Sequence, residues 1–172
     1  MFARPNSLHS QVAYVTNDLP AAMARLKEEY GTPGFFEMCN IQPGEDPTGK
    51  PVLKIAIAVV GGVEIELIEP VGDTAPLFRD FLPQGNEHEL AIRFHHIATR
   101  IEGGMANWEA HLGSIDQNRH PVVFEGAVGD MLRYVYTDER ATLGHFLEHV
   151  WMSPELLAQM RTLIPSFPPV EG

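Results

Sequence analysis

The first 31 residues show two hydrophobic patterns in succession. Residues 8–16 are rich in β-branched and aromatic side chains, which predicts a strand. From residue 17 onward the apolar residues recur at helical spacing, on one face of a predicted amphipathic helix. Asp18 suits the start of this helix and Gly31 suits its end. The chain is therefore expected to open with a strand followed by a helix.

Three further strands are predicted after this helix, at residues 34–41, 52–60 and 63–70. The Pro- and Gly-rich residues 42–51 predict a loop between the first two of them. The Gly-Gly pair at 61–62 predicts a tight turn, so the last two strands should form a hairpin. The order in this half of the chain is strand, helix and three strands.

The same order of elements occurs a second time after a polar stretch, residues 70–89, in which residues 77–82 predict a short helix. The second set comprises a strand at 90–101, a helix at 103–114, a strand at 120–126, and a hairpin of 129–138 with 143–151. A βαβββ unit is thus repeated in pattern, although not in residue identity.

The repeat predicts an α+β fold within one domain spanning residues 1–172. We divide it into module 1 (about 8–69), a linker (70–89), module 2 (90–152) and a C-terminal tail (153–172). Ser153 and Pro154 predict the start of one short helix in the tail, and the Pro-rich end cannot continue it.

Composition narrows the classes of function. Hydrophobic residues make up 44% and charged residues 20% of the 172, as in an ordinary folded protein. The formal net charge of −11 works against a nucleic acid or an anionic membrane as a partner. We find no apolar run of about 18 residues and no secretory signal, so the expected location is the cytoplasm. Cys39 is the only cysteine, which excludes an intrachain disulfide and a thiolate metal cluster.

Chemically matched residues lie on matched elements of the two modules. His96 follows His9 by 87 positions, both on first strands, and Glu148 follows Glu66 by 82, both on last strands. Imidazole and carboxylate together suit Zn, Ni, Co, Mn or Fe, so these four are candidate ligands of one divalent metal ion. His95 precedes His96 on the same predicted strand and should point to the opposite face, where we interpret it as a packed or surface histidine.

Four segments carry a resemblance to a known family: HSQVAYV, VEIELIEP, FHHIA and GHFLEHV. In this order and on these elements, the chain resembles the vicinal oxygen chelate superfamily, which includes glyoxalase I, methylmalonyl-CoA epimerase and the extradiol dioxygenases. The resemblance covers nearly the whole chain. It implies that two tandem βαβββ modules form a curved, barrel-like mixed sheet around a central metal site. It also implies that His9, Glu66, His96 and Glu148 meet on the concave face of this sheet.

The activity that the resemblance implies is that of a metal-dependent lyase, isomerase or epimerase of the glyoxalase I or methylmalonyl-CoA epimerase type. Two His and two Glu ligands leave open positions for adjacent oxygens of a small-molecule substrate. Removal of a proton next to the substrate carbonyl would give an enolate, whose negative charge the metal ion offsets. Glu148 is our preferred base and Glu66 the second candidate, and their roles could be exchanged. Related proteins are commonly homodimers, so a homodimer is expected.

Three other functions compete with this one. His145 to His149 match the HxxEH pattern of zinc peptidases, which requires a helix, whereas the neighbouring residues favour a strand. An Fe(II) extradiol-type ring-cleavage dioxygenase would use two His and one carboxylate, so Glu66 argues against it. Non-enzymatic relatives that bind drugs such as bleomycin lack the metal ligands that this chain retains, which favours an enzyme.

Several Arg and Tyr residues on the predicted strands are suited to orient a substrate, but the sequence cannot rank them. They are Tyr14, Arg93, Arg100, Arg133, Tyr134 and Tyr136.

Overall fold

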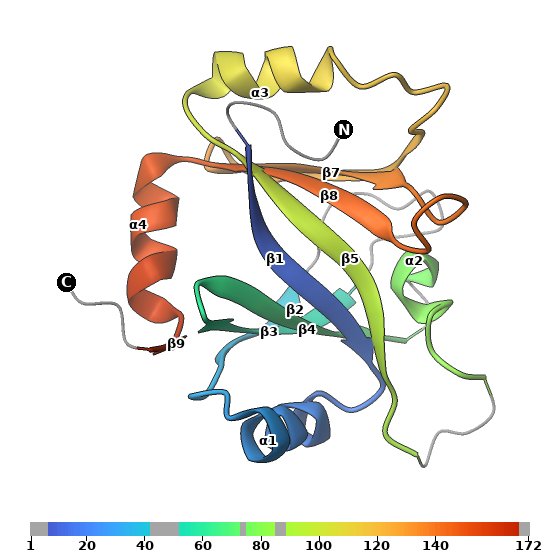
Figure 1. Cartoon of the computed structure of the whole chain (residues 1–172), viewed down its shortest axis with the longest axis vertical. Helices are drawn as coiled ribbons and strands as arrows, with labels where there is room; N and C mark the ends of the chain where they lie inside the picture. Colours follow the sequence, from blue (N-terminus) through green and yellow to red (C-terminus); the bar gives the residue numbers. More distant parts are fainter. Residues whose placement is uncertain (1–6, 42–51, 73–74, 85–88, 169–172) are drawn as a thin grey trace.

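The strands of the two halves join in a single mixed sheet, shown in Figure 1. The computed structural model describes residues 7–41, 52–72, 75–84 and 89–168, so the predicted loop at 42–51 and parts of the predicted linker lie outside the described residues. In chain order the elements are β1 (Ser7–Thr16), α1 (Leu19–Tyr30), β2 (Phe36–Ile41), β3 (Val52–Val60), β4 (Val63–Val71), α2 (Pro76–Arg79), β5 (Ile92–Ile101), α3 (Met105–Leu112), β6 (Val122–Val128), β7 (Leu132–Asp138), β8 (Phe146–Met152), α4 (Pro154–Leu163) and β9 (Ser166–Phe167).

The strand order is β2-β3-β4-β1-β5-β8-β7-β6, with β9 beside β3. Each half pairs its first strand in parallel with its last, β1 with β4 and β5 with β8. The halves meet where β1 and β5 run antiparallel, so an approximate twofold relation runs through the middle of the sheet. The sheet curls around its concave face (Figure 1). The predicted α+β class and the two βαβββ modules are confirmed.

Each half covers the convex face of its sheet with one helix. Asp18 accepts a hydrogen bond from the backbone N–H of Ala21 and caps α1, and Gly31 ends it with a left-handed φ of 70°. The buried face of α1 includes Leu26 and packs on Ala56 and Leu67 of the sheet. The helix α3 packs through Trp108, in the same way, on the second half of the sheet.

The concave face is filled at one end by aromatic side chains. Phe78 of α2 is almost completely buried in a cluster with Phe146, Tyr136 and Phe124. Burial of several aromatic rings at this end contributes much of the apolar stabilisation of the fold. The polar residues of the candidate site therefore stand next to a packed core.

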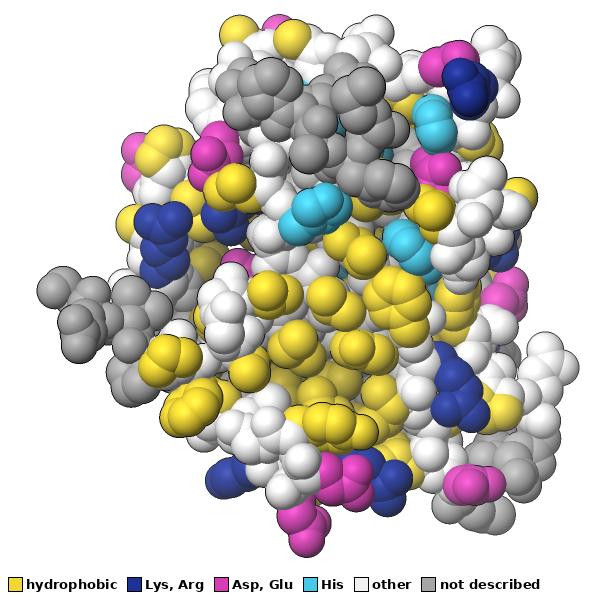
Figure 2. Space-filling view, in the orientation of Figure 1, with side chains coloured by type: hydrophobic (Ala, Val, Ile, Leu, Met, Phe, Trp, Pro, Cys, Tyr) yellow, Lys and Arg dark blue, Asp and Glu magenta, His cyan; other side chains and the backbone are white. Residues whose placement is uncertain are grey.

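The outer face presents a different surface. Figure 2 shows hydrophobic side chains gathered over β1 and β5 on the face turned to the viewer. Tyr14 of β1 and Phe94 of β5 contact each other with ring centroids 6.0 Å apart, and Phe94 is exposed.

The tail forms the predicted helix α4, in which the Ser153 hydroxyl accepts a hydrogen bond from the backbone N–H of Leu156. Beyond it the sequence predicted no further element, but β9 adds to the edge of the sheet beside Val59 and Val60. Within the described residues, no helix is both long and apolar enough to cross a membrane.

Two irregularities interrupt the pairing of β1 with β5. Ser10 is left over between the pairs His9–Thr99 and Gln11–Ala98, and His95 is left over opposite Ala13 and Tyr14. Such bulges turn two consecutive side chains toward the same face of a sheet. In agreement, Ser10 and Gln11 are both buried, and so are His95 and His96.

Candidate metal centre

Four polar side chains meet on the concave face, one from each of the four central strands. Glu66 comes from β4, Gln11 from β1, His96 from β5 and Glu148 from β8. The Gln11 amide nitrogen donates to Glu66 Oε2 at 2.6 Å and lies 3.4 Å from His96 Nε2. The same His96 nitrogen lies 3.3 Å from Glu148 Oε2 and 3.6 Å from Glu66 Oε2. We call these four residues the central cluster.

The central cluster contains three of the four residues that the sequence suggested, and Gln11 stands where His9 was expected. His9 is exposed and precedes the bulge at Ser10. Because side chains alternate along a strand and the bulge interrupts this alternation, we infer that His9 points to the convex face. Gln11 contacts both Glu66 and His96.

The symmetry of the sheet also makes Gln11 the counterpart of His96. Across the β1–β5 pair, Gln11 lies opposite Ala98 and His96 lies opposite Ala13, which is a twofold arrangement. The acids follow the same rule, because Glu66 pairs with Ala13 and Glu148 pairs with Ala98. The sequence offset between the first-strand residues is therefore 85 and not 87, since 96 − 11 = 85.

His95 does not face away from His96, as the alternation of a regular strand predicted. The bulge turns both rings to the concave side, where His95 is completely buried against the rings of Phe78 and Phe81. Its Nε2 lies 3.0 Å from the carbonyl oxygen of Leu77, and its Nδ1 lies 2.8 Å from Nδ1 of His96. The interpretation of His95 as a packed histidine is correct, but its face was wrongly predicted.

These contacts determine which nitrogen of His96 carries a proton. A carbonyl oxygen only accepts, so His95 donates from Nε2 to Leu77. Burial lowers the pKa of His95 well below its ordinary value, so the ring is neutral and its Nδ1 accepts from His96. In neutral His96 the lone pair then lies on Nε2, the atom that faces the two carboxylates and the Gln11 amide nitrogen.

The central cluster holds more negative charge than its surroundings offset. Burial raises the pKa of Glu66 well above its ordinary value, and the charges of Glu148 and Glu64 add to this effect. Tyr136 is buried beside the acids and shares a hydrogen bond with Glu148. Two buried carboxylates that face one imidazole and one amide are stable when a proton or a cation lies between them.

The residues fit a divalent metal ion in their donor chemistry. Carboxylate oxygens, the imidazole Nε2 and an amide oxygen are all ligands of such ions, and Gln11 would turn its amide oxygen to the site. Bonds of about 2.1 Å at right angles place neighbouring donors roughly 3 Å apart, close to the distances seen here. However, no three His, Cys, Asp or Glu side chains in the described part of the chain already have the arrangement of a metal site. Small side-chain movements would be needed to complete one.

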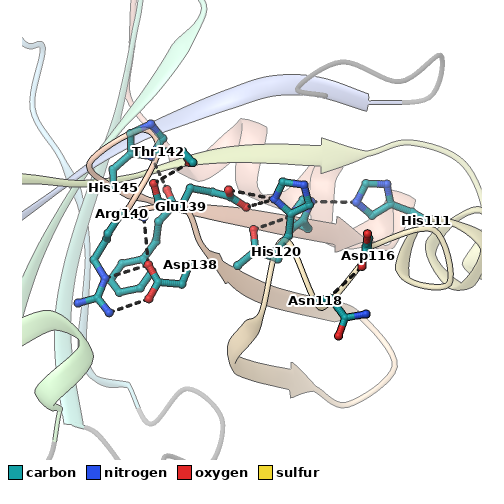
Figure 3. A network of polar contacts seen from close by, with 12 residues as sticks. His111, Asp116, Asn118, His120, Asp138, Glu139, Arg140, Thr142 and His145 are labelled. Carbon is teal, nitrogen blue, oxygen red and sulfur yellow. Dashed lines mark hydrogen bonds and ion pairs between the residues drawn. The ribbon is translucent and has the colours of Figure 1, made fainter.

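A second polar network lies outside the central cluster, in the second half of the protein (Figure 3). His120 contacts the carboxylate of Glu139 at 2.9 Å, and His111 contacts His149 at 2.8 Å. Since β8 is a strand, His149 belongs to this network while Glu148 lies on the concave face. The helix that the HxxEH peptidase pattern requires is absent at His145 to His149, so that alternative is wrong.

The fold and the central cluster define a class of protein, in which two βαβββ halves bring carboxylate and imidazole donors together on a concave sheet. The profile of the Glyoxalase/Bleomycin resistance protein/Dioxygenase superfamily matches residues 10–136. The chain therefore belongs to this superfamily, and the resemblance inferred from the sequence is confirmed. No curated protein sequence matches significantly.

Solved structures share the fold at low sequence identity. A hypothetical protein from Bacillus halodurans superposes with a TM-score of 0.62 at 14% identity, over 86% of this chain and 95% of the other. Methylmalonyl-CoA epimerase from Mycobacterium tuberculosis gives 0.58 at 17% identity, over 92% and 97%. The Streptomyces coelicolor epimerase in complex with 2-nitronate-propionyl-CoA gives 0.58 at 19% identity, over 84% and 96%.

Proposed function

We propose that this protein is a metal-dependent lyase, isomerase or epimerase that moves a proton at a carbon atom next to a substrate carbonyl group. The observation that carries this proposal is the burial of Glu66 and Glu148 around one His96 nitrogen on the concave face. A pair of carboxylates in one buried site can supply both a metal ligand and a base. Epimerases of the same fold, at low identity, are consistent with the proposal.

The proposed ligands of one divalent ion are Gln11, Glu66, His96 and Glu148. Gln11 takes the place of His9 among the four ligands predicted from the sequence. Zn, Ni, Co, Mn and Fe all suit these donors, and the sequence does not choose among them. The bound ion would supply positive charge next to the substrate oxygens, which acidifies the neighbouring C–H bond. His95 would keep the Nε2 lone pair of His96 directed at the site.

Proton transfer is assigned to the carboxylates. Glu148 is the proposed base and Glu66 the second candidate, so the same carboxylate would act both as a metal ligand and as the base. The Tyr136 hydroxyl, bonded to Glu148, would hold this carboxylate in place while it takes a proton from carbon and returns it. The aromatic rings packed around the site would exclude water from the transferred proton.

The composition of the central cluster disfavours a ring-cleavage dioxygenase, because such enzymes use two His and one carboxylate and this cluster has one His and two carboxylates. A non-enzymatic binding protein has no need of two buried acids beside an imidazole. The small-molecule substrate and the homodimer both remain predictions.

The test combines metal analysis with proton exchange. Protein purified without a metal-affinity tag is loaded with each of the five ions and incubated in D2O with a panel of 2-oxo and 2-hydroxy acids, aldehydes and thioesters. We expect deuterium at the carbon next to the carbonyl of at least one compound, by NMR, only with metal. Glu148→Gln should lower the exchange rate by about 100-fold or more, since a general base contributes this much.

Glu125→Gln removes an exposed strand carboxylate and serves as the matched control. Wild-type protein that takes up no metal would overturn the proposal. Coloured ring-opened products from catechols, formed by the Fe(II) form under oxygen, would establish the dioxygenase instead.

A further inference from the structure

One row of side chains next to the central cluster contains two buried donors. Arg100 of β5 and Tyr134 of β7 both pair with Val150 of β8, which lies between them. The preceding row on the same face contains Glu148, which lies opposite Ala98 and Tyr136. Two residues along a strand span about 7 Å, so Arg100 and Tyr134 stand about one such step from the proposed base.

Tyr134 is buried without a described partner for its hydroxyl group. The residue is 6% exposed, and its Oη is among the buried polar atoms that make no hydrogen bond to any described residue. Its neighbour Tyr136 is hydrogen-bonded to Glu148, so only one of these two phenol groups has a described partner. Burial and the charge of Glu148 raise the pKa of Tyr134, which keeps its O–H as a donor.

Arg100 is in a similar position. Its side chain is only 14% exposed, and its Nε makes no hydrogen bond to the part of the chain that is described. One terminal nitrogen lies 3.8 Å from Glu64, a long ion pair.

Buried donors without acceptors are rare in native proteins, because a donor that loses its water and gains no acceptor destabilises the folded state. The acceptor that suits a guanidinium and a phenol together is a carboxylate, which Arg binds with directional hydrogen bonds. Val150 between them is apolar, so its side chain offers neither donor an acceptor.

We propose that the substrate is a dicarboxylate-type acid: its adjacent oxygens bind at the central cluster, and its distal carboxylate is held by Arg100 and Tyr134. This inference rests on the proposed function. Arg100 and Tyr134 are therefore specificity residues, which select a second negative charge in the row of side chains next to that of Glu148.

The test compares two acids of equal chain length. Protein loaded with Co(II) is titrated with 2-oxoglutarate, which has a distal carboxylate, and with 2-oxopentanoate, which lacks it. Calorimetry gives the two affinities, and the visible Co(II) spectrum reports whether each acid reaches the metal. We expect 2-oxoglutarate to bind at least 10-fold more tightly to the wild type.

Arg100→Gln should reduce this preference to about twofold or less, and Tyr134→Phe should reduce it several-fold. Arg93→Gln, an exposed arginine on the same strand, should leave it unchanged. If Arg100→Gln unfolds, as judged by circular dichroism, Tyr134→Phe decides. Equal affinities in a wild type that holds Co(II) would overturn this inference and leave the proposed function standing. Failure to hold Co(II) would overturn both.

Discussion

The two bulges in the middle of the sheet have the same backbone form but different chemistry. On β1 the bulge turns Ser10 and Gln11 to the concave face, and on β5 it turns His95 and His96 to the same face. In the first half the second residue is an amide, bonded to a carboxylate of its own half. In the second half it is an imidazole, which the residue before it orients.

This difference shows that the two halves preserve the position of a side chain more strictly than its residue type. The two halves keep the register, the bulge and the acidic residue of the last strand. The first-strand residue has diverged between Gln11 and His96. We therefore expect the two halves to contribute unequally to metal binding, with the second half dominant.

Replacing the two first-strand residues tests this inequality, and it has the largest expected effect. His96→Ala should weaken binding of Zn(II) or Co(II) about 100-fold or more, because it removes the only imidazole of the central cluster. Gln11→Ala should weaken it about 10-fold, since an amide oxygen is a poorer ligand. Competition with a chromogenic chelator measures both.

Two further variants sharpen the same measurement. Gln11→His makes the two halves chemically alike and should bind at least as tightly as the wild type. His9→Ala should bind like the wild type, because His9 is exposed before the bulge. A loss in His9→Ala as large as that in His96→Ala would restore the assignment of His9 as the ligand.

The sequence predicted the fold well because hydrophobic spacing and turn residues act locally. Asp18, Gly31 and Ser153 end or begin helices where expected, and the order of strands follows from the repeat. The β9 strand was missed, because its two residues are a strand only through their pairing with β3, which is distant in sequence. Short edge strands of this kind leave no periodic signal.

Three residues of the central cluster, Glu66, His96 and Glu148, were predicted because His and Glu recur on matched strands of the two modules. Gln11 was missed, since a bulge inserts one residue and cannot be read from alternation. The one available signal was the alignment of Ala13 with Ala98 at an offset of 85, because 98 − 13 = 85. Both alanines are fully buried under the cluster.

Replacement of His95, which orients His96 in the second half, has the next largest expected effect. His95→Phe fills the aromatic surroundings but removes the acceptor for His96 Nδ1, so it should lower metal affinity about 10-fold. His95→Asn supplies an amide oxygen as acceptor and should recover part of the loss. Nitrogen-15 NMR of metal-free protein should show a change of His96 tautomer in His95→Phe.

A role for His95 in packing alone predicts another result. The metal affinity would then follow thermal stability across the two variants. Unchanged tautomer populations in His95→Phe would show that His95 does not orient His96.

The smallest expected effect concerns the charge that the two halves share. In metal-free protein at neutral pH, Glu66→Gln should raise the free energy of unfolding by about 1 kcal/mol, because it removes a buried charge facing Glu148 and Glu64. The new amide still accepts from Gln11 through its oxygen. Urea denaturation measures the change, and Glu125→Gln, which is exposed, should show none.

The pH dependence gives the sign of the same effect. Since the pKa of Glu66 is raised above its ordinary value of 4.5 in the folded state, folded protein binds more protons than unfolded protein above that pH. Metal-free wild type should therefore gain stability as the pH falls from neutral toward 5, and Glu66→Gln should lose this gain. Saturating metal should make the wild type the more stable of the two proteins, because only the wild type keeps both carboxylates. Metal at 100 times its Kd adds about 2.7 kcal/mol to the free energy of unfolding. A Glu66→Gln protein that is less stable than the metal-free wild type at neutral pH would mean that the two acids already share a proton, so that the two halves of the site are coupled before any metal binds.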